Sequence, residues 1–193
     1  MNPICALLVL FLSQATVLTG PSYPPNAVAG ANVVGVLHFS SGAVRNIDVL
    51  SGEAPFVEPA AAALSGWKLG NTANNDVLVV VNYRTPTLYS VGSGSLEVAQ
   101  VKASPGLAYP RTVIEPRYPP NLLAEGSVVL KLALSESGSV TKISVVQGLG
   151  GMTEACVAAA SQWKFNPARN RQNAVIASEA YAVFVVRRPI LTN

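Results

Sequence analysis

The chain has 193 residues, enough for one ordinary domain or two small ones. Half of the residues are apolar, 12% are charged and the net charge is +3, which excludes a disordered chain and an acidic or basic tail. The basic residues are scattered along the sequence rather than gathered in a patch with aromatics, so no nucleic-acid partner is expected.

Residues 1–20 are predicted to be a signal peptide or an N-terminal anchor. The apolar core from Ile4 to Leu12 is too short to span a bilayer comfortably and is typical of a signal-peptide h-region. Ser13 and Ala15 are the small residues that a signal peptidase favours, which predicts cleavage after Ala15. Because no Lys or Arg precedes the apolar core, an uncleaved anchor is the alternative.

Residues 21–86 predict a small unit with the order strand, strand, helix, strand. Apolar residues alternate on both sides of Ser41-Gly42, which indicates a hairpin. Residues 60–64 predict a helix, and Val77–Tyr83 predicts a third strand. The helix carries mostly small side chains, so this unit is expected to bury less apolar surface than a well-formed copy. Residues 87–112, which contain two clusters of Gly, Ser and Pro, are predicted to be a linker.

Residues 113–193 predict the same order of elements in a better-formed unit. Large apolar residues recur at every second position, at Val128, Leu130, Leu132 and Leu134, and a second apolar run follows Ser137-Gly138. In that second run the apolar residues are spaced three and then two apart, which predicts a bulge. Residues 152–161 contain no Gly or Pro and predict a helix, and Tyr181–Val186 predicts the last strand. A short helix is also expected from Tyr118 through 124.

The two units are related as an internal repeat of about 70 residues, which is longer than a solenoid unit. Tyr23-Pro24-Pro25-Asn26 recurs as Tyr118-Pro119-Pro120-Asn121, 95 residues later. Four further anchors recur at an offset of 96: Ser41-Gly42, Ile47, Val49 and Trp67-Lys68. The sequence therefore predicts an α+β protein of two tandem domains, each with a three-stranded antiparallel or mixed sheet and one helix.

The sequence contains no recognisable catalytic, metal or cofactor site. The lone histidine, His38, excludes a His-based metal cluster and a convincing catalytic triad. The two cysteines, Cys5 and Cys156, lie in an apolar N-terminal segment and in a predicted helix, so they are not expected to pair. We therefore expect no enzyme, no cofactor and no small-molecule substrate.

The predicted topology leaves a sheet edge open. A hairpin followed by a crossover helix gives the strand order second, first, third, so the third strand is expected at an edge with unpaired N–H and C=O groups. An extended peptide could add to such an edge by β-augmentation. The predicted peptide-binding strand of the second unit comprises Tyr181, Ala182, Val183, Phe184, Val185, Val186 and Arg187.

The order Tyr-Pro-Pro, hairpin with Gly, small-residue helix and Trp163-Lys164-Phe165-Asn166-Pro167-Ala168 resembles the C-terminal domain of TonB proteins. These are energy transducers of the Gram-negative envelope. The resemblance is closer over 115–189 than over 21–86, where the first copy is degenerate. It implies binding of a TonB box, a short extended segment of outer-membrane transporters, by strand addition at the third strand.

The resemblance also implies that residues around the Tyr-Pro motif touch the partner; here these are Glu115, Arg117, Tyr118 and Pro119. Glu115 stands where the family form has Gln, and Gly20 stands at that place in the first copy. A TonB transducer also has a membrane anchor and a long Pro-rich spacer. We do not expect this chain to transmit proton-motive force by itself.

Two hypotheses follow for the function. In the first, the protein is a non-catalytic periplasmic or secreted binding protein, inner-membrane anchored if residues 4–20 are not cleaved. It engages an outer-membrane TonB-dependent transporter or another envelope protein. In the second, the protein is structural and self-assembling, and the same edge strands pair between domains or between subunits of a homo-oligomer.

Overall fold

A computed structural model describes residues 16–70, 75–87, 93–95 and 104–189. Most of the predicted signal peptide or anchor and most of residues 88–103 lie outside these ranges, so the expectations for them stay predictions. Among the described helices, neither is long and apolar enough to cross a membrane.

The first half contains the four elements that its sequence predicts. Strands β1 (Ala31–Ser40) and β2 (Ala43–Ser51) form the hairpin, and helix α1 (Val57–Ser65) connects it to strand β3 (Asp76–Tyr83). β1 pairs antiparallel with both β2 and β3. α1 begins at Val57, before the start at Ala60 that the sequence predicted.

The second half repeats this order and adds short strands around it. Strands β6 (Gly126–Leu134) and β7 (Val140–Gln147), helix α2 (Met152–Ala160) and strand β11 (Ser178–Val186) form the repeated unit. The short strands are β4 (Ser93–Ser95), β5 (Tyr109–Ile114), β8 (Lys164–Asn166), β9 (Ala168–Arg169) and β10 (Val175–Ile176).

These short strands change two expectations. β4, β5 and β8 form a three-stranded sheet, so the expected linker 87–112 contributes strands to the second half. Residues 118–124 form no helix; Leu122 N–H donates to Pro119 O at 3.1 Å in a turn. The Tyr118 hydroxyl instead bonds to both the N–H and the C=O of Ala124, which closes this segment as a loop.

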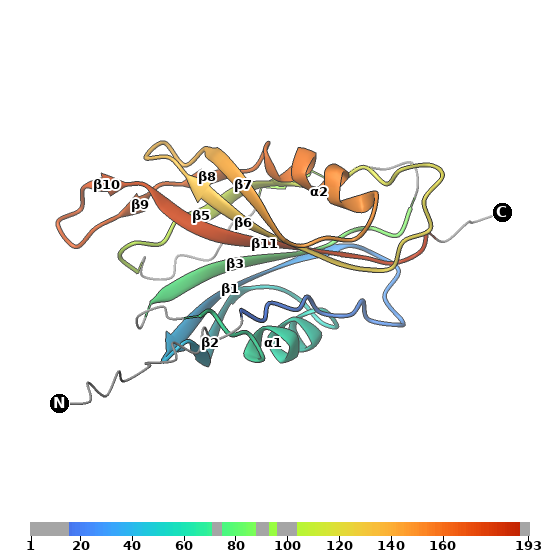
Figure 1. The fold of residues 1–193 in the computed structure, drawn as a ribbon, viewed down its shortest axis with the longest axis horizontal. Helices are drawn as coiled ribbons and strands as arrows, with labels where there is room; N and C mark the ends of the chain where they lie inside the picture. The colour runs from blue at the N-terminus through green and yellow to red at the C-terminus, as the bar shows by residue number, and fades with distance from the viewer. Residues whose placement is uncertain (1–15, 71–74, 88–92, 96–103, 190–193) are drawn as a thin grey trace, which may run out of the picture.

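The two halves share one six-stranded mixed sheet rather than two separate three-stranded sheets. Its order is β2-β1-β3-β11-β6-β7, and β3 and β11 run parallel at its centre. α1 covers one face of this sheet and α2 covers the other, as Figure 1 shows. Each half keeps the predicted strand order of second, first, third. The two three-stranded sheets are nevertheless joined into one, since the third strand of each half is paired with the third strand of the other.

Bulges occur at the same places in both hairpins. The register between β6 and β7 shifts next to Leu134 and next to Leu130, which leaves Thr141 and Val146 as extra residues in β7. The register between β1 and β2 shifts in the same way, at Arg45 and Leu50. The bulge predicted from the spacing of apolar residues in the second unit is confirmed.

The apolar core has two layers, and each layer takes residues from both halves. The layer under α2 includes Leu78 and Val80 of β3 as well as Phe184 of β11. The layer under α1 includes Val183 and Val185 of β11 as well as Val81 of β3. Because successive strand residues point to opposite faces, each central strand contributes to both layers.

The two tryptophans occupy equivalent places at the ends of the helices. Trp67 and Trp163 are both fully buried. The indole Nε1–H of Trp67 donates to Thr19 O at 2.7 Å, and that of Trp163 donates to Ile114 O at 2.9 Å. Each indole thereby ties the segment before a Tyr-Pro motif to the end of a helix.

Candidate functional site

The predicted peptide-binding strand lies in the interior of the sheet. β11 pairs parallel with β3 from Ala180–Leu78 to Val185–Tyr83, and antiparallel with β6 from Ser178–Leu134 to Val186–Gly126. The expectation of an open edge is therefore wrong. Two third strands with unpaired backbone groups satisfy each other, which removes both edges at once. We call the β3–β11 pair the seam.

Side chains of β11 fill both layers of the core at the seam. The ring of Tyr181 lies on the α1 face, 5.5 Å from the Trp67 ring, and burial raises its pKa. The ring of Phe184 lies on the α2 face, 5.1 Å from the Trp163 ring. Val183 is completely buried between β3 and β6. The seam is thus an apolar strand-addition interface whose added strand comes from the same chain.

An arginine at the end of β3 reaches the Tyr-Pro motif of the second half. Arg84 is 1% exposed, and its guanidinium carbon lies 5.4 Å from the centre of the Tyr118 ring. Its Nε–H donates to Pro116 O at 2.7 Å, and its Nη1 donates to Thr87 O at 2.6 Å and to Thr85 O. Burial lowers the pKa of Arg84, and the nearby Glu115 carboxylate opposes this shift.

Tyr118 is itself held in place by its own segment. Its hydroxyl donates to Ala124 O at 2.7 Å and accepts from Ala124 N at 2.6 Å. The far end of the loop after the Tyr-Pro step is therefore held against the tyrosine side chain. The flat ring is therefore presented to Arg84 as a fixed surface, on which a planar guanidinium can stack.

An equivalent contact joins an arginine of the second half to the Tyr-Pro motif of the first half. Arg187 directly follows β11, and its guanidinium carbon lies 5.4 Å from the centre of the Tyr23 ring. Its Nη1 donates to Ala27 O at 2.9 Å, and the Tyr23 hydroxyl donates to Ala29 O at 2.6 Å. Burial raises the pKa of Tyr23 to about 12, although Arg187 opposes this shift. We call the pairs Arg84–Tyr118 and Arg187–Tyr23 the arginine clasps.

Of the remaining predicted residues, Glu115 lies beside the first clasp. Glu115 Oε1 accepts from Thr85 Oγ1 at 3.1 Å, so this carboxylate contacts the first half. Pro119 is half-buried and Arg117 is exposed. At the place equivalent to Glu115, a side chain on Gly20 would collide with Ser127, because the first half packs tightly against β6 there. The structure thus brings Glu115 and Tyr118 together with Arg84 and leaves Arg117 at the surface.

Sequence reasoning missed Arg84, Thr85 and Tyr23 as site residues. All three lie in the first copy, which the sequence predicts to be degenerate, and their role depends on contact with the other half. The signal was nevertheless present: Arg84 directly follows the third strand of its unit, as Arg187 follows the third strand of the second unit. The same alignment of the two repeats makes Tyr23 the equivalent of Tyr118.

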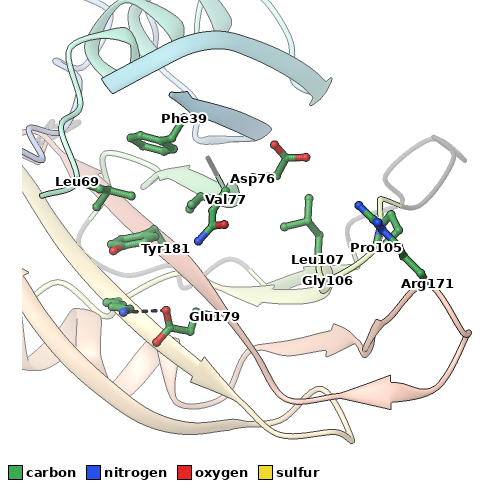
Figure 2. A pocket seen from close by; sticks show the side chains of 12 residues that line it. Phe39, Leu69, Asp76, Val77, Pro105, Gly106, Leu107, Arg171, Glu179 and Tyr181 are labelled. Carbon is green, nitrogen blue, oxygen red and sulfur yellow. Dashed lines mark ion pairs between the residues drawn. The ribbon is translucent and has the colours of Figure 1, made fainter. Parts of the chain in front are cut away.

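A pocket of about 530 Å³ lies at the other end of the seam, where β3 and β11 begin. Figure 2 shows Phe39, Leu69 and Tyr181 at one side of it and Arg171 at the other. Lys131 and Glu179 also line the pocket, where Lys131 Nζ and Glu179 Oε2 form an ion pair at 2.8 Å, and this contact raises the pKa of Lys131. Charges of both signs are thus distributed around this pocket.

The two outer strands of the sheet, β2 and β7, are poorly suited to strand addition. Each contains two bulges, and each carries exposed charged side chains, among them Arg45, Asp48 and Lys142. Bulges and charges on edge strands are common devices against pairing with another chain. The surface in the described part of the chain that does hold an extended strand is therefore the seam with its clasps.

Comparison with known families gives one match. Residues 114–182 match the family model described as Gram-negative bacterial TonB protein C-terminal. The match begins at the end of β5 and ends within β11, so it covers β6, β7, α2 and the start of the third strand. The resemblance drawn from the sequence is confirmed for this part of the chain. No curated protein and no solved structure gives a significant match.

Proposed function

We propose that this protein is a non-catalytic binding protein of a Gram-negative-type envelope that engages an extended segment of an outer-membrane TonB-dependent transporter. It acts in the periplasm, either free or held at the inner membrane by residues 4–20. The observation that carries the proposal is the match of residues 114–182 to the TonB C-terminal family. We infer that residues 21–86 are a second, diverged copy of the same unit.

The geometry of the second half supports this proposal. β11 together with the Tyr118 segment already holds an extended apolar strand, namely β3, and an arginine that follows it. Main-chain pairing supplies affinity in such an interface, and side-chain pockets supply selectivity. A partner segment would pair with β11 at the place that β3 occupies in this structure.

A direct test uses the full chain and synthetic peptides. Peptides with the sequences of periplasm-facing N-terminal segments of outer-membrane transporters are labelled, and their binding is followed by fluorescence anisotropy. Scrambled peptides of the same composition serve as controls. Saturable binding of the native peptides alone supports the proposal. Equal signals from native and scrambled peptides, or no binding to a folded chain, overturn it.

The structural hypothesis is the second candidate, and the seam favours it. The third strands do pair between the two halves, so the protein could serve as a closed scaffold that holds no external strand. Pairing between two chains would instead give homo-oligomers whose mass rises with concentration. Size-exclusion chromatography with light scattering separates these cases, because a closed scaffold stays monomeric at every concentration.

A further inference from the structure

We call β11, the Tyr118 ring and the carbonyl oxygen of Pro116 the recognition surface of the second half. In this structure β3 and the arginine after it occupy that surface. β3 lies parallel to β11 over Leu78–Tyr83 and presents valines to both layers of the core. Directly after it, Arg84 enters a site made by the Tyr118 ring and the carbonyl oxygen of Pro116. An apolar strand followed by an arginine therefore fits this surface.

The same combination of an apolar strand and a following arginine occurs at the first half, so the arrangement is found twice in the molecule. β11 is the apolar strand there, and Arg187 is the arginine that stacks on Tyr23 and donates to Ala27 O. Both guanidinium carbons lie 5.4 Å from the centre of the tyrosine ring they face. Each half thus recognises a strand and its arginine in the same way.

We propose that β3 with Arg84 is an internal ligand that masks the recognition surface of the second half, and that a partner displacing it has the same form: an extended apolar segment, parallel to β11, followed by an arginine. This inference rests on the proposed function, since it names the kind of segment that the same surface takes. Arg84 is a specificity residue of this surface, and the closed molecule is its self-masked state.

The arginine matters because of its shape as well as its charge. Arg84 uses separate nitrogens to donate to Pro116 O and to the carbonyls of Thr85 and Thr87, while its plane faces the Tyr118 ring. A lysine has a compact ammonium group, and it cannot make the forked contacts and the stacking together. Buried, desolvated arginines and aromatics are also the residues that dominate binding interfaces.

The probe for the experiment is the internal ligand itself. A fluorescent peptide with the sequence of residues 76–87 is added to the full chain, and binding is measured by anisotropy. A second peptide carries the change Arg84→Ala. The chain is used unmodified, with Arg84→Ala or with Arg84→Lys. Arg188→Ala is the matched control, because Arg188 is exposed and makes a long ion pair of 3.8 Å with Glu125.

Weakening the internal ligand should open the surface to the probe. We expect the Arg84→Ala chain to bind the native peptide at least about tenfold more tightly than the unmodified or Arg188→Ala chain does, about 1.4 kcal/mol. The Arg84→Ala peptide should bind at least about tenfold more weakly than the native one. If the Arg84→Ala chain does not fold, Arg84→Lys should show the same direction, because it keeps the charge and loses the fork.

A disulfide that links β3 to β11 provides the second part of the experiment. Val81 and Val183 are neighbours in the parallel register and lie in the same core layer. Adjacent strands are about 4.8 Å apart, which suits a disulfide between cysteines at these positions. The two native cysteines are first replaced, with Cys156→Ala copying Ala60 of the first half. The oxidised chain should bind no peptide, and reduction should restore binding.

Each result decides between the two proposals. Equal binding of both peptides, or equal binding by the oxidised and reduced chains, overturns the internal ligand. Arg-dependent binding of peptide 76–87 without binding of any transporter peptide supports the internal ligand and overturns the proposed function. Transporter peptides that bind equally to the oxidised and reduced chains support the proposed function and overturn this inference.

Discussion

At the scale of single residues, the Tyr-Pro motif acts through the tyrosine ring and hydroxyl. Tyr118 is buried, and its hydroxyl makes two hydrogen bonds to the backbone of Ala124. Tyr23 makes the corresponding bond to Ala29 in the first half. The motif therefore has a structural role in shaping its own loop, in addition to the surface that it offers to an arginine.

Tyr118→Phe should lower the free energy of unfolding by about 1–3 kcal/mol, because the Ala124 N–H loses its acceptor. Urea denaturation followed by circular dichroism measures the change. Tyr109→Phe is a useful comparison, since the Tyr109 hydroxyl accepts a single bond, from Ser104 N at 2.9 Å. An unchanged midpoint for Tyr118→Phe would contradict this account of the motif.

The only histidine should make stability depend on pH near neutrality. His38 Nε2 lies 2.9 Å from Asp48 Oδ2, and its Nδ1 lies 2.7 Å from Asp76 Oδ1. Both contacts are donor bonds only in the protonated ring, and together they raise the pKa of His38 above its ordinary value of 6.5. A raised pKa in the folded state means that the stabilisation is complete below 6.5 and is lost as pH rises through the raised value.

His38→Gln should remove this dependence. Unfolding midpoints in urea are compared between about pH 6 and pH 9, where a histidine with a raised pKa titrates. The unmodified chain should lose stability towards the upper end relative to His38→Gln. Parallel curves for the two chains over this range would show that the contacts with Asp48 and Asp76 do not favour the charged ring.

At the scale of secondary-structure elements, the hairpins are shaped by turns and bulges. Gly138 has φ +76°, and its carbonyl accepts from Phe165 N at 2.9 Å, so the β6–β7 turn is tied to the strand after α2. Gly42 has φ +78° and accepts from Leu69 N at 2.9 Å in the first half. Each turn is therefore a junction between a hairpin and the segment that follows its helix.

Gly138→Ala should destabilise the protein by about 2–3 kcal/mol. A Cβ at this position would overlap the carbonyl group of Phe165, and the positive φ disfavours any L side chain. The control is Gly66→Ala, where the nearest atom to a new Cβ lies at an ordinary 3.5 Å. Chemical denaturation of both variants checks the difference, and equal losses would contradict it.

At the scale of the whole molecule, the seam makes two repeats into one cooperative unit. Strands β3 and β11 supply side chains to both core layers, so neither helix packs only on strands of its own half. A unit of about 70 residues is near the size at which a single core is marginal, and the shared sheet supplies the additional burial. Separation of the halves would expose both layers at once.

The two tryptophans allow this cooperativity to be measured. Trp67 lies in the first half and Trp163 in the second. In single-tryptophan variants made with Trp67→Phe or Trp163→Phe, fluorescence and far-ultraviolet circular dichroism should give the same urea midpoint within each variant. Two separate transitions in either variant, with the tryptophan following one of them, would show that the halves unfold independently.

The sequence by itself determined the local content of the fold. The repeated Tyr-Pro step, the Ser-Gly turns, the alternating strands, the small-residue helices and one bulge all depend on residues that are close together in the chain. The resemblance of residues 115–189 to the TonB C-terminal domain was also recognisable from ordered motifs, and the family match bears it out over residues 114–182. Local periodicity and turn chemistry are sufficient for these features.

Only the tertiary structure decided what covers the third strands. The sequence indicated that Tyr181–Val186 would be an open edge, because each unit alone has one. The edge is closed by β3, and Arg84 occupies the surface beside Tyr118. Strand pairing between segments a hundred residues apart leaves no periodic signal in either segment, since an apolar strand looks the same whether its partner is a peptide, another chain or its own repeat.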